Sequence, residues 1–331
     1  MSIEQSRVSH SLPDATRMAT LKAVSSNVRL HDLLFTDQGL ATERLKQLLA
    51  TLKFKDSHGT LLHEQRSLTH HTVEEVLQEC IVKSLMNKFS YEVAPGVAPT
   101  PEQLEILDRL GLVAPIALVD PFPYDVGIVF GGLLEACCAR VRNLISQDTT
   151  CSVIALFGSE RELTQAREVP DQFVKTLGQD YVNDLYERNE FPKTEAAMMR
   201  CVWDKLVQGT KYQDAQVIVV NSKLRTDEQR AAPGAIETVQ DFREVVVSSQ
   251  RLPGLTVAPT RFLLSSSQPH GIRQLADFLS SYIVPLRYPQ QMTVDVVAYK
   301  RSATSPTSLL LYLQELGKLV HSQYTARYPS K

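Results

Sequence analysis

The sequence predicts an α/β fold, with a doubly wound, mainly parallel, Rossmann-like sheet that follows an N-terminal α-helical region. Three observations carry this prediction. From residue 125 onward, short runs rich in Val, Ile, Leu and Phe recur, and each is followed by a segment with helical periodicity. The runs are continuously apolar, which is typical of strands buried on both faces of a parallel sheet. Before residue 115 the patterns are almost entirely helical.

Residues 1–114 form the predicted helical region. Apolar residues recur there at intervals of three and four, which indicates amphipathic helices. Pro101 suits the first turn of a short helix, because a first-turn residue needs no backbone N–H donor. Prolines and a glycine precede it, and we place a soft domain boundary near Pro115. The expected helices cover 41–54, 71–89 and 101–110.

Residues 115–331 form the predicted α/β domain, which ends in a long helix. Strands and helices alternate, so right-handed crossovers should place helices on both faces of the sheet. The last segment, 307–324, has apolar residues at helical spacing and is expected to pack on the sheet or on the N-terminal helices. Strands are expected over 125–130, 151–158, 215–221, 260–266 and 292–300, and helices over 133–146, 194–206, 235–246 and 271–284.

Composition and charge exclude several classes of protein. With 331 residues and 43% hydrophobic content, the chain can fill one large core or two smaller ones. The 35 basic and 37 acidic residues nearly balance and no long basic run occurs, so nucleic acid is not an expected partner. No uncharged apolar run approaches the roughly 18 residues that a membrane span requires.

The N-terminus and the cysteines indicate a cytoplasmic protein. Residues 1–22 lack the apolar segment of a secretory signal, although delivery by a specialised secretion system would leave no such trace. The five cysteines are odd in number and none is spaced as CxxC, so we expect buried free thiols and no disulfide framework. His70 and His71 are adjacent and His270 has no close partner in the sequence, so no metal site is predicted.

Small and polar residues stand where the predicted strands end, which is where ligands bind in an open parallel sheet. Gly131 and Gly132 follow the first strand and would allow an anion to approach the backbone at a helix N-terminus. Tight strand-to-helix packing explains the same two glycines about equally well. Gly158 and Ser159 follow the second strand, where an ordinary exposed turn is favoured over a ligand loop. Asn221 ends the third strand.

Two further junctions carry charged or hydroxyl side chains. Thr194 is a candidate N-cap, and Glu195 shares the core-facing side of the next helix with Met198. The helix dipole explains an acid in the first turn but not the face on which it lies, so a functional carboxylate is favoured. Arg225 lies on a long loop and could clamp a phosphate or carboxylate, although a solvated loop charge is the commoner case. Thr238 lies in the first turn of the following helix.

The stretch "SSSQPHGIR" joins the fourth strand to its helix. His270 would lie at a helix N-terminus, where the dipole favours a neutral imidazole that can accept a proton. Ser266 and Arg273 would complete a ligand-binding strand end, and a purely structural histidine is the open alternative. Replacing Arg273 with alanine is then expected to weaken binding of an anion and to leave the fold intact.

Together these junctions resemble the SanA, ElyC and YdcF-like family over about residues 124–300. The resemblance rests on the glycine pair, an arginine in the next helix (Arg140), the Gly158 loop, "TEAAMM", "IETVQDF" and "SSSQPHGIR". It implies a Rossmann-like domain of unknown function that is linked to bacterial envelope metabolism and binds nucleotide-like molecules such as S-adenosylmethionine, with no agreed reaction. Leu133 stands in place of the family's third glycine, and the N-terminal helices have no counterpart.

We therefore hold two hypotheses from different classes. In the first, the protein binds, and in a stronger form also transforms, an anionic nucleotide-like or phosphorylated small molecule at the carboxyl edge of the sheet, with Glu195 and His270 as the catalytic candidates and no evident nucleophile. In the second, it is a non-catalytic interaction module whose N-terminal helices bind a protein partner. The candidate ligand-binding residues are Gly131, Gly132, Gly158, Ser159, Asn221, Arg225, Thr238, Ser266 and Arg273.

Overall fold

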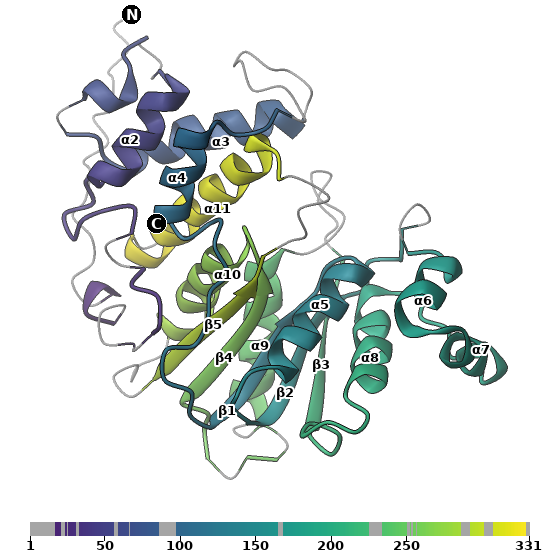
Figure 1. Ribbon diagram of the computed structural model, residues 1–331. Coiled ribbons are helices and arrows are strands. Elements are labelled where there is room, and N and C mark those ends of the chain that lie inside the picture. The colour runs from purple at the N-terminus through teal and green to yellow at the C-terminus, as the bar shows by residue number, and fades with distance from the viewer. Residues whose placement is uncertain are drawn as a thin grey trace, which may run out of the picture.

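A parallel β-sheet lies at the centre of the molecule (Figure 1). The computed structural model describes residues 17–328 except for 21–23, 25, 31–32, 56–58, 66, 86–96, 165–167, 225–233, 250–251, 253, 256, 286–291 and 301–306. Within these residues the sheet has five strands, all parallel, in the order β3-β2-β1-β4-β5. The predicted α/β class with a doubly wound parallel sheet is confirmed. The strands are β1 (Tyr124–Phe130), β2 (Cys151–Ser159), β3 (Gln216–Ser222), β4 (Arg261–Ser267) and β5 (Thr293–Tyr299).

Helices cover both faces of the sheet. Figure 1 shows α5 and α8 on one face and α9 and α10 on the other. Each strand has apolar side chains for both faces, as the continuous apolar runs predicted: Phe130 packs in the cluster on the α9–α10 side, and Val129 packs in the cluster on the α5–α8 side. These helices are α5 (Leu134–Ile145), α8 (Glu195–Leu206), α9 (Ala235–Ser249) and α10 (Gly271–Phe278).

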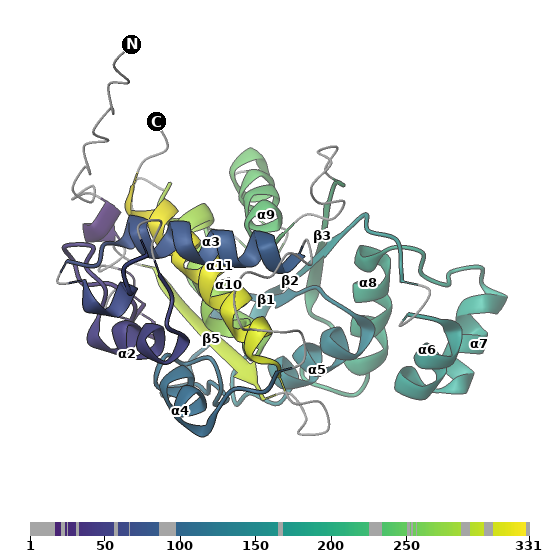
Figure 2. The same ribbon diagram turned by 90° about the horizontal axis from the view of Figure 1, so that it is seen from above.

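The N-terminal helices share a core with the α/β region. One cluster of buried apolar side chains contains Leu45 and Leu49 from the N-terminal helices together with Phe262 and Leu264 from β4. The last helix, α11 (Leu309–Arg327), packs against both α3 and α10, and Figure 2 shows α3 and α11 side by side. The core is therefore continuous across the boundary predicted near Pro115. The N-terminal elements are α2 (Glu43–Leu52), the short 3-10 helix η1 (Leu62–Glu64), α3 (His70–Leu85) and α4 (Pro101–Arg109).

Side-chain caps begin several of these helices. The Thr42 hydroxyl accepts a hydrogen bond from Leu45 N at the start of α2, and Thr194 does the same for Ala197 N at the start of α8. Thr100 and Gln103 form a reciprocal capping box ahead of α4, where Pro101 occupies the first turn as predicted. The ends of the predicted and observed helices agree closely, apart from 86–89, which lie outside the described residues.

Two helices were not predicted, and a third is divided. The segment between β2 and α8 contains α6 (Pro170–Leu177) and α7 (Gln179–Glu187), which extend beyond α8 at the side of the sheet (Figure 1). Each buries only two side chains, so neither has enough apolar repeats to show a helical period. The helix expected over 271–284 consists of α10 and a π-helical turn, η2 (Leu279–Ile283).

Two expectations from the composition concern free thiols and membrane-spanning helices. Cys137, Cys138 and Cys151 are buried free thiols, and Cys201 is a partly buried one. Within the parts of the chain that the structure describes, no helix combines the length and the apolar character that crossing a bilayer would require.

Candidate functional site

The carboxyl ends of the strands bring most of the predicted residues to one edge of the sheet. The parallel register pairs Phe130 with Phe157 and Gly158 with Asn221, so the residues that follow β1, β2 and β3 lie side by side. The strand order reverses direction between β1 and β4, which makes this gap the topological switch point of the sheet. His270 follows β4 and therefore lies at the same edge.

The glycine turn after β1 closes around a carboxylate of the protein itself. Glu195 Oε2 accepts a hydrogen bond of 2.5 Å from Ser159 Oγ, and a backbone hydrogen bond from Gly132 also reaches this carboxylate. A Cβ atom on Gly131 would lie 2.7 Å from Glu195 Oε1 and 2.4 Å from the carbonyl oxygen of Phe157. Gly131 is thus required by close approach, and the neighbours that it admits are the backbone carbonyl of Phe157 and the carboxylate of Glu195, both from the protein itself.

Gly158 has a packing explanation too. A Cβ atom at this position would lie 2.6 Å from Ala196 Cα, which is a contact with backbone and cannot be relieved by a side-chain rotation. The glycine lets the first turn of α8 rest directly on β2. This contact in turn positions Glu195, the first residue of α8, over the end of the strand.

Burial governs the protonation of Glu195. Removal from water raises the pKa of this carboxyl above its ordinary value, and hydrogen bonding to Ser159 and the charge of Arg161 offset only part of the effect. Arg161 approaches Glu195 Oε1 to 3.9 Å but forms its close, forked ion pair with Glu168, at 2.8 and 3.1 Å. A carboxyl group with a raised pKa, next to a hydroxyl, retains its proton more readily than an exposed carboxyl and can therefore serve as a proton donor.

Arg140 fills the switch point with a buried positive charge. Its side chain rises from α5, and the residue is only 4% exposed. One nitrogen donates to the carbonyl oxygens of Phe130, at 2.9 Å, and of Gly131, and the other donates to Ser267 Oγ at 3.0 Å, so the guanidinium joins the ends of β1 and β4. Its Nε has no hydrogen-bond partner. Among the described residues no carboxylate forms an ion pair with Arg140, and burial lowers its pKa.

His270 lies beside this cation at the N-terminus of α10. Burial lowers the pKa of its imidazole, and the charge of Arg140 adds to the effect, whereas Glu315 opposes it. His270 Nδ1 lies 2.9 Å from Glu315 Oε2, so the imidazole is held against a buried carboxylate. The neutral imidazole that the sequence predicted is therefore favoured, with burial as the main cause instead of the helix dipole.

Arg273 is part of a buried ion network that joins α10 to α11. Its Nε donates to Glu315 Oε2 at 2.9 Å and its Nη1 to Asp277 Oδ2 at 2.5 Å. Lys318 contacts the other oxygen of Glu315 at 2.8 Å, and Ser322 donates to Asp277. Burial raises the pKa of Asp277, whereas Arg273, His270 and Lys318 outweigh burial and hold the pKa of Glu315 well below its ordinary range. Arg273 thus already has two acidic partners.

The other candidates are dispersed or lie outside the described residues. Asn221 is exposed at the end of β3. The Thr238 hydroxyl donates to the carbonyl oxygen of Gly234 at 3.1 Å, and the Ser266 hydroxyl donates to Gln274, so both are engaged inside the protein. Arg225 lies outside the described residues. No group of acidic, histidine or cysteine side chains in the described parts of the chain is arranged to hold a metal ion.

Sequence reasoning passed over three charged residues at this edge. Arg140 was named only through the family resemblance, and Glu168 carries no local motif. Glu315 did have a signal, because it lies three residues after Tyr312 and four before Leu319 on the apolar face of α11. A charged residue on a buried helix face usually has a charged partner, which here is Arg273.

Comparisons with known proteins add no relative. The chain matches no family model, and the searches of curated proteins and of solved structures give no match either. The resemblance to the SanA, ElyC and YdcF-like family therefore stays a prediction from the order of residues, and the function must be inferred from the site alone.

Proposed function

We propose that the carboxyl edge of the sheet binds an anionic small molecule, nucleotide-like or phosphorylated, at the switch point between β1 and β4. The observation that carries this proposal is Arg140, a buried guanidinium with an unpartnered Nε and no acidic partner among the described residues. Desolvating a cation is costly unless an opposite charge compensates it. A bound anion would supply that charge.

The geometry favours the β4 side of the gap for the anionic group. The turn at Gly131 and Gly132 is filled by Glu195, so the phosphate cradle that a glycine pair suggests is already occupied by a carboxylate. On the other side, Ser267 and His270 stand next to Arg140 and lead into the N-terminal turn of α10. Backbone N–H groups and the helix dipole attract anions at such a turn.

In the stronger form of the proposal, the site also transfers protons. Burial raises the pKa of Glu195 and lowers the pKa of His270. Arg140 is close enough to both that its charge helps to lower the pKa of His270 and that the charge of Glu195 acts on Arg140. A carboxyl group with a raised pKa retains its proton more readily, which suits an acid, and an imidazole with a lowered pKa stays neutral, which suits a base. The nucleotide-like character of the ligand, with S-adenosylmethionine as one example, is carried only by the family resemblance.

The experiment is a thermal-stability screen with nucleotides, phosphosugars and S-adenosylmethionine. A ligand at 100 times its dissociation constant is expected to stabilise the folded protein by about 2.7 kcal/mol. Arg140→Gln should weaken binding of the selected anion by about 1.5 to 3 kcal/mol, roughly ten- to hundredfold, and Arg140→Lys by less. Arg142→Gln is the matched control, because Arg142 is exposed on the same helix.

Affinity is measured per folded molecule, since Arg140 also ties β1 to β4 and its loss will lower stability. Equal anion affinity in the wild type and in folded Arg140→Gln would remove the anion-binding role of Arg140. Loss of turnover with retained binding in His270→Ala or Glu195→Gln would support the proton-transfer role.

One observation favours the alternative, a non-catalytic interaction module on an inherited scaffold. Glu195 satisfies the glycine turn internally, which is what a site that no longer receives a ligand would show. This alternative would be favoured if no compound in the screen raised the thermal stability of the wild type. It would also require specific capture of a protein partner that depends on exposed side chains of α2 or α4.

A further inference from the structure

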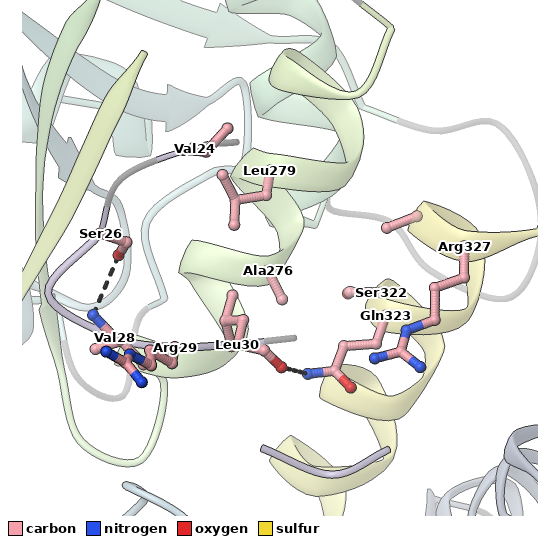
Figure 3. A pocket seen from close by; sticks show the side chains of 11 residues that line it. Val24, Ser26, Val28, Arg29, Leu30, Ala276, Leu279, Ser322, Gln323 and Arg327 are labelled. Carbon is pink, nitrogen blue, oxygen red and sulfur yellow. Dashed lines mark hydrogen bonds between the residues drawn. The ribbon is translucent and has the colours of Figure 1, made fainter. Parts of the chain in front are cut away.

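A pocket lies between the N-terminal segment and the last two helices of the core (Figure 3). Its walls come from the described residues between 24 and 30, from α10 and from α11. None of its lining residues belongs to the candidate site at the carboxyl edge, so an inference about it is independent of the proposed function. The lining residues are Val24, Ser26, Val28, Arg29, Leu30, Ala276, Leu279, Ser322, Gln323, Ala326 and Arg327.

The body of the pocket is apolar. Val24, Leu30, Ala276, Leu279 and Ala326 are at most 9% exposed. Figure 3 shows Ala276 of α10 and Leu279 of η2 projecting between the two other walls. The pocket has a cavity volume of about 60 Å³ and opens to solvent. Ligand pockets typically occupy about 300 to 1,000 Å³, so only a small apolar part of a ligand would enter, and the rest would lie at the open mouth.

One polar atom in the wall has no partner. Gln323 is 6% exposed; its Nε2 donates to the carbonyl oxygen of Leu30 at 3.0 Å, while its Oε1 is buried without a hydrogen bond. Leaving an amide oxygen buried and unpaired typically costs about 1 to 3 kcal/mol, so a ligand that donates a hydrogen bond there would gain affinity. The Nε2 bond to Leu30 already fixes the orientation of the amide.

An unpaired positive charge stands at the mouth. Arg29 is exposed, and its guanidinium has no ion pair or hydrogen bond with any residue in the described parts of the chain. Among the described residues that line the pocket, none is acidic. Arg29 would therefore attract an anionic group of a ligand at the mouth, and no acidic side chain among the described lining residues would repel it.

We propose that this pocket binds a small amphipathic anion, with part of an aromatic or aliphatic body inside, a hydrogen-bond donor toward Gln323 Oε1 and a carboxylate or sulfonate near Arg29. The apolar walls favour the body, the unpaired amide oxygen favours a donor such as N–H or O–H, and Arg29 selects a negative head group over a neutral or positive one. The ligand class is thus that of aryl or acyl carboxylates that carry a hydroxyl or amide group.

Two fluorescent probes with the same aromatic body test the charge preference. 8-Anilino-1-naphthalenesulfonate carries an N–H donor and a sulfonate, and N-phenyl-1-naphthylamine carries the same donor without the sulfonate. Both should bind the full-length protein with a rise in fluorescence. Arg29→Gln should weaken the sulfonate probe by about three- to fivefold, as expected for an exposed charge pair, and leave the neutral probe unchanged. Arg142→Gln, an exposed arginine on α5, should change neither.

Variants that fill the pocket test its location. Ala276→Phe places a ring in the space between α10 and α11 and should abolish binding of both probes at this site. If Ala276→Phe fails to fold by circular dichroism, Val28→Trp at the half-buried rim replaces it. Undiminished binding of both probes in a folded pocket-filling variant would overturn the proposal. Equal affinity of the sulfonate probe for the wild type and Arg29→Gln would overturn the anionic preference.

Discussion

Arg273→Ala is expected to destabilise the fold, in contrast with the sequence-based expectation that it would only weaken ligand binding. The guanidinium donates to two carboxylates, Glu315 at 2.9 Å and Asp277 at 2.5 Å, and its side chain is 12% exposed. The side chains of these carboxylates are 1% and 2% exposed, so water cannot replace the lost partner. Removing one member of a buried ion pair typically costs about 3 to 5 kcal/mol.

A matched control exists on the surface of the same protein. Arg200 and Asp204 on α8 form an ion pair with the same four-residue spacing as Arg273 and Asp277, but their side chains are 49% and 43% exposed. Exposed pairs of this kind contribute about 0.3 to 0.5 kcal/mol. Arg200→Ala should therefore cost roughly a tenth as much as Arg273→Ala, although both changes remove an arginine from a helix.

Urea unfolding followed by circular dichroism measures the difference. With a slope near 3 kcal/mol per molar urea, Arg273→Ala should lower the midpoint by about 1 to 1.7 M, and Arg200→Ala by less than about 0.2 M. The deficit of Arg273→Ala should shrink between pH 7.5 and pH 5, because an abandoned Asp277, whose pKa burial already raises, is neutralised more easily at low pH. Equal midpoints for the two variants at pH 7.5 would refute the buried-network argument.

Two further predictions concern residues that position the core and the site. Burial lowers the pKa of His70 to about 3, so the unfolded state takes up a proton first, and stability should fall as the pH drops below about 6.5, by about 1.4 kcal/mol at pH 5.5. His70→Gln should flatten that slope in urea titrations at several pH values, whereas His71→Gln, at the neighbouring half-buried histidine, is the control. Equal pH slopes for the two variants would contradict the assignment. Gly158→Ala should cost roughly 1 to 3 kcal/mol, because its Cβ would lie 2.6 Å from Ala196 Cα. A wild-type melting temperature for Gly158→Ala would show that α8 is not held by this contact.

The fold could be predicted from the sequence to the extent that each element has an apolar repeat. All five strands were predicted with ends that agree within two residues, because buried parallel strands are continuously apolar and bounded by polar residues. Helices α6 and α7 were missed because each buries only two side chains, which is too few to show a helical period. These are Phe173 and Leu177 in α6, and Val182 and Leu185 in α7. The π-helical turn after α10 has no sequence signal, because the apolar spacing continues through it.

Candidate site residues could be predicted by position but not by partner. Parallel strands must end at a common edge, so the placement of Glu195 and His270 there follows from the strand pattern. Which charges pair across that edge depends on α11, which returns to α10 from more than thirty residues downstream in the sequence and brings Glu315 to His270 and Arg273. No local motif encodes the packing of α11 on α10. His270 and Arg273, which the sequence suggests are available to a ligand, therefore already contact Glu315 in the folded chain.

The glycine turn after β1 illustrates why a motif with a sound mechanism can still mislead about a ligand. A glycine at a strand end signals that a polar group approaches the backbone closely, and the Cβ contacts at Gly131 confirm such an approach. The signal does not distinguish a phosphate from a carboxylate of the chain, because both satisfy the same N–H groups. Glu195, at the start of α8, accepts the backbone hydrogen bond that a phosphate would otherwise accept. Arg140 is therefore the better candidate for binding a ligand. A buried cation that forms no ion pair with a described carboxylate is a better marker of a missing anion than backbone donors that are already satisfied.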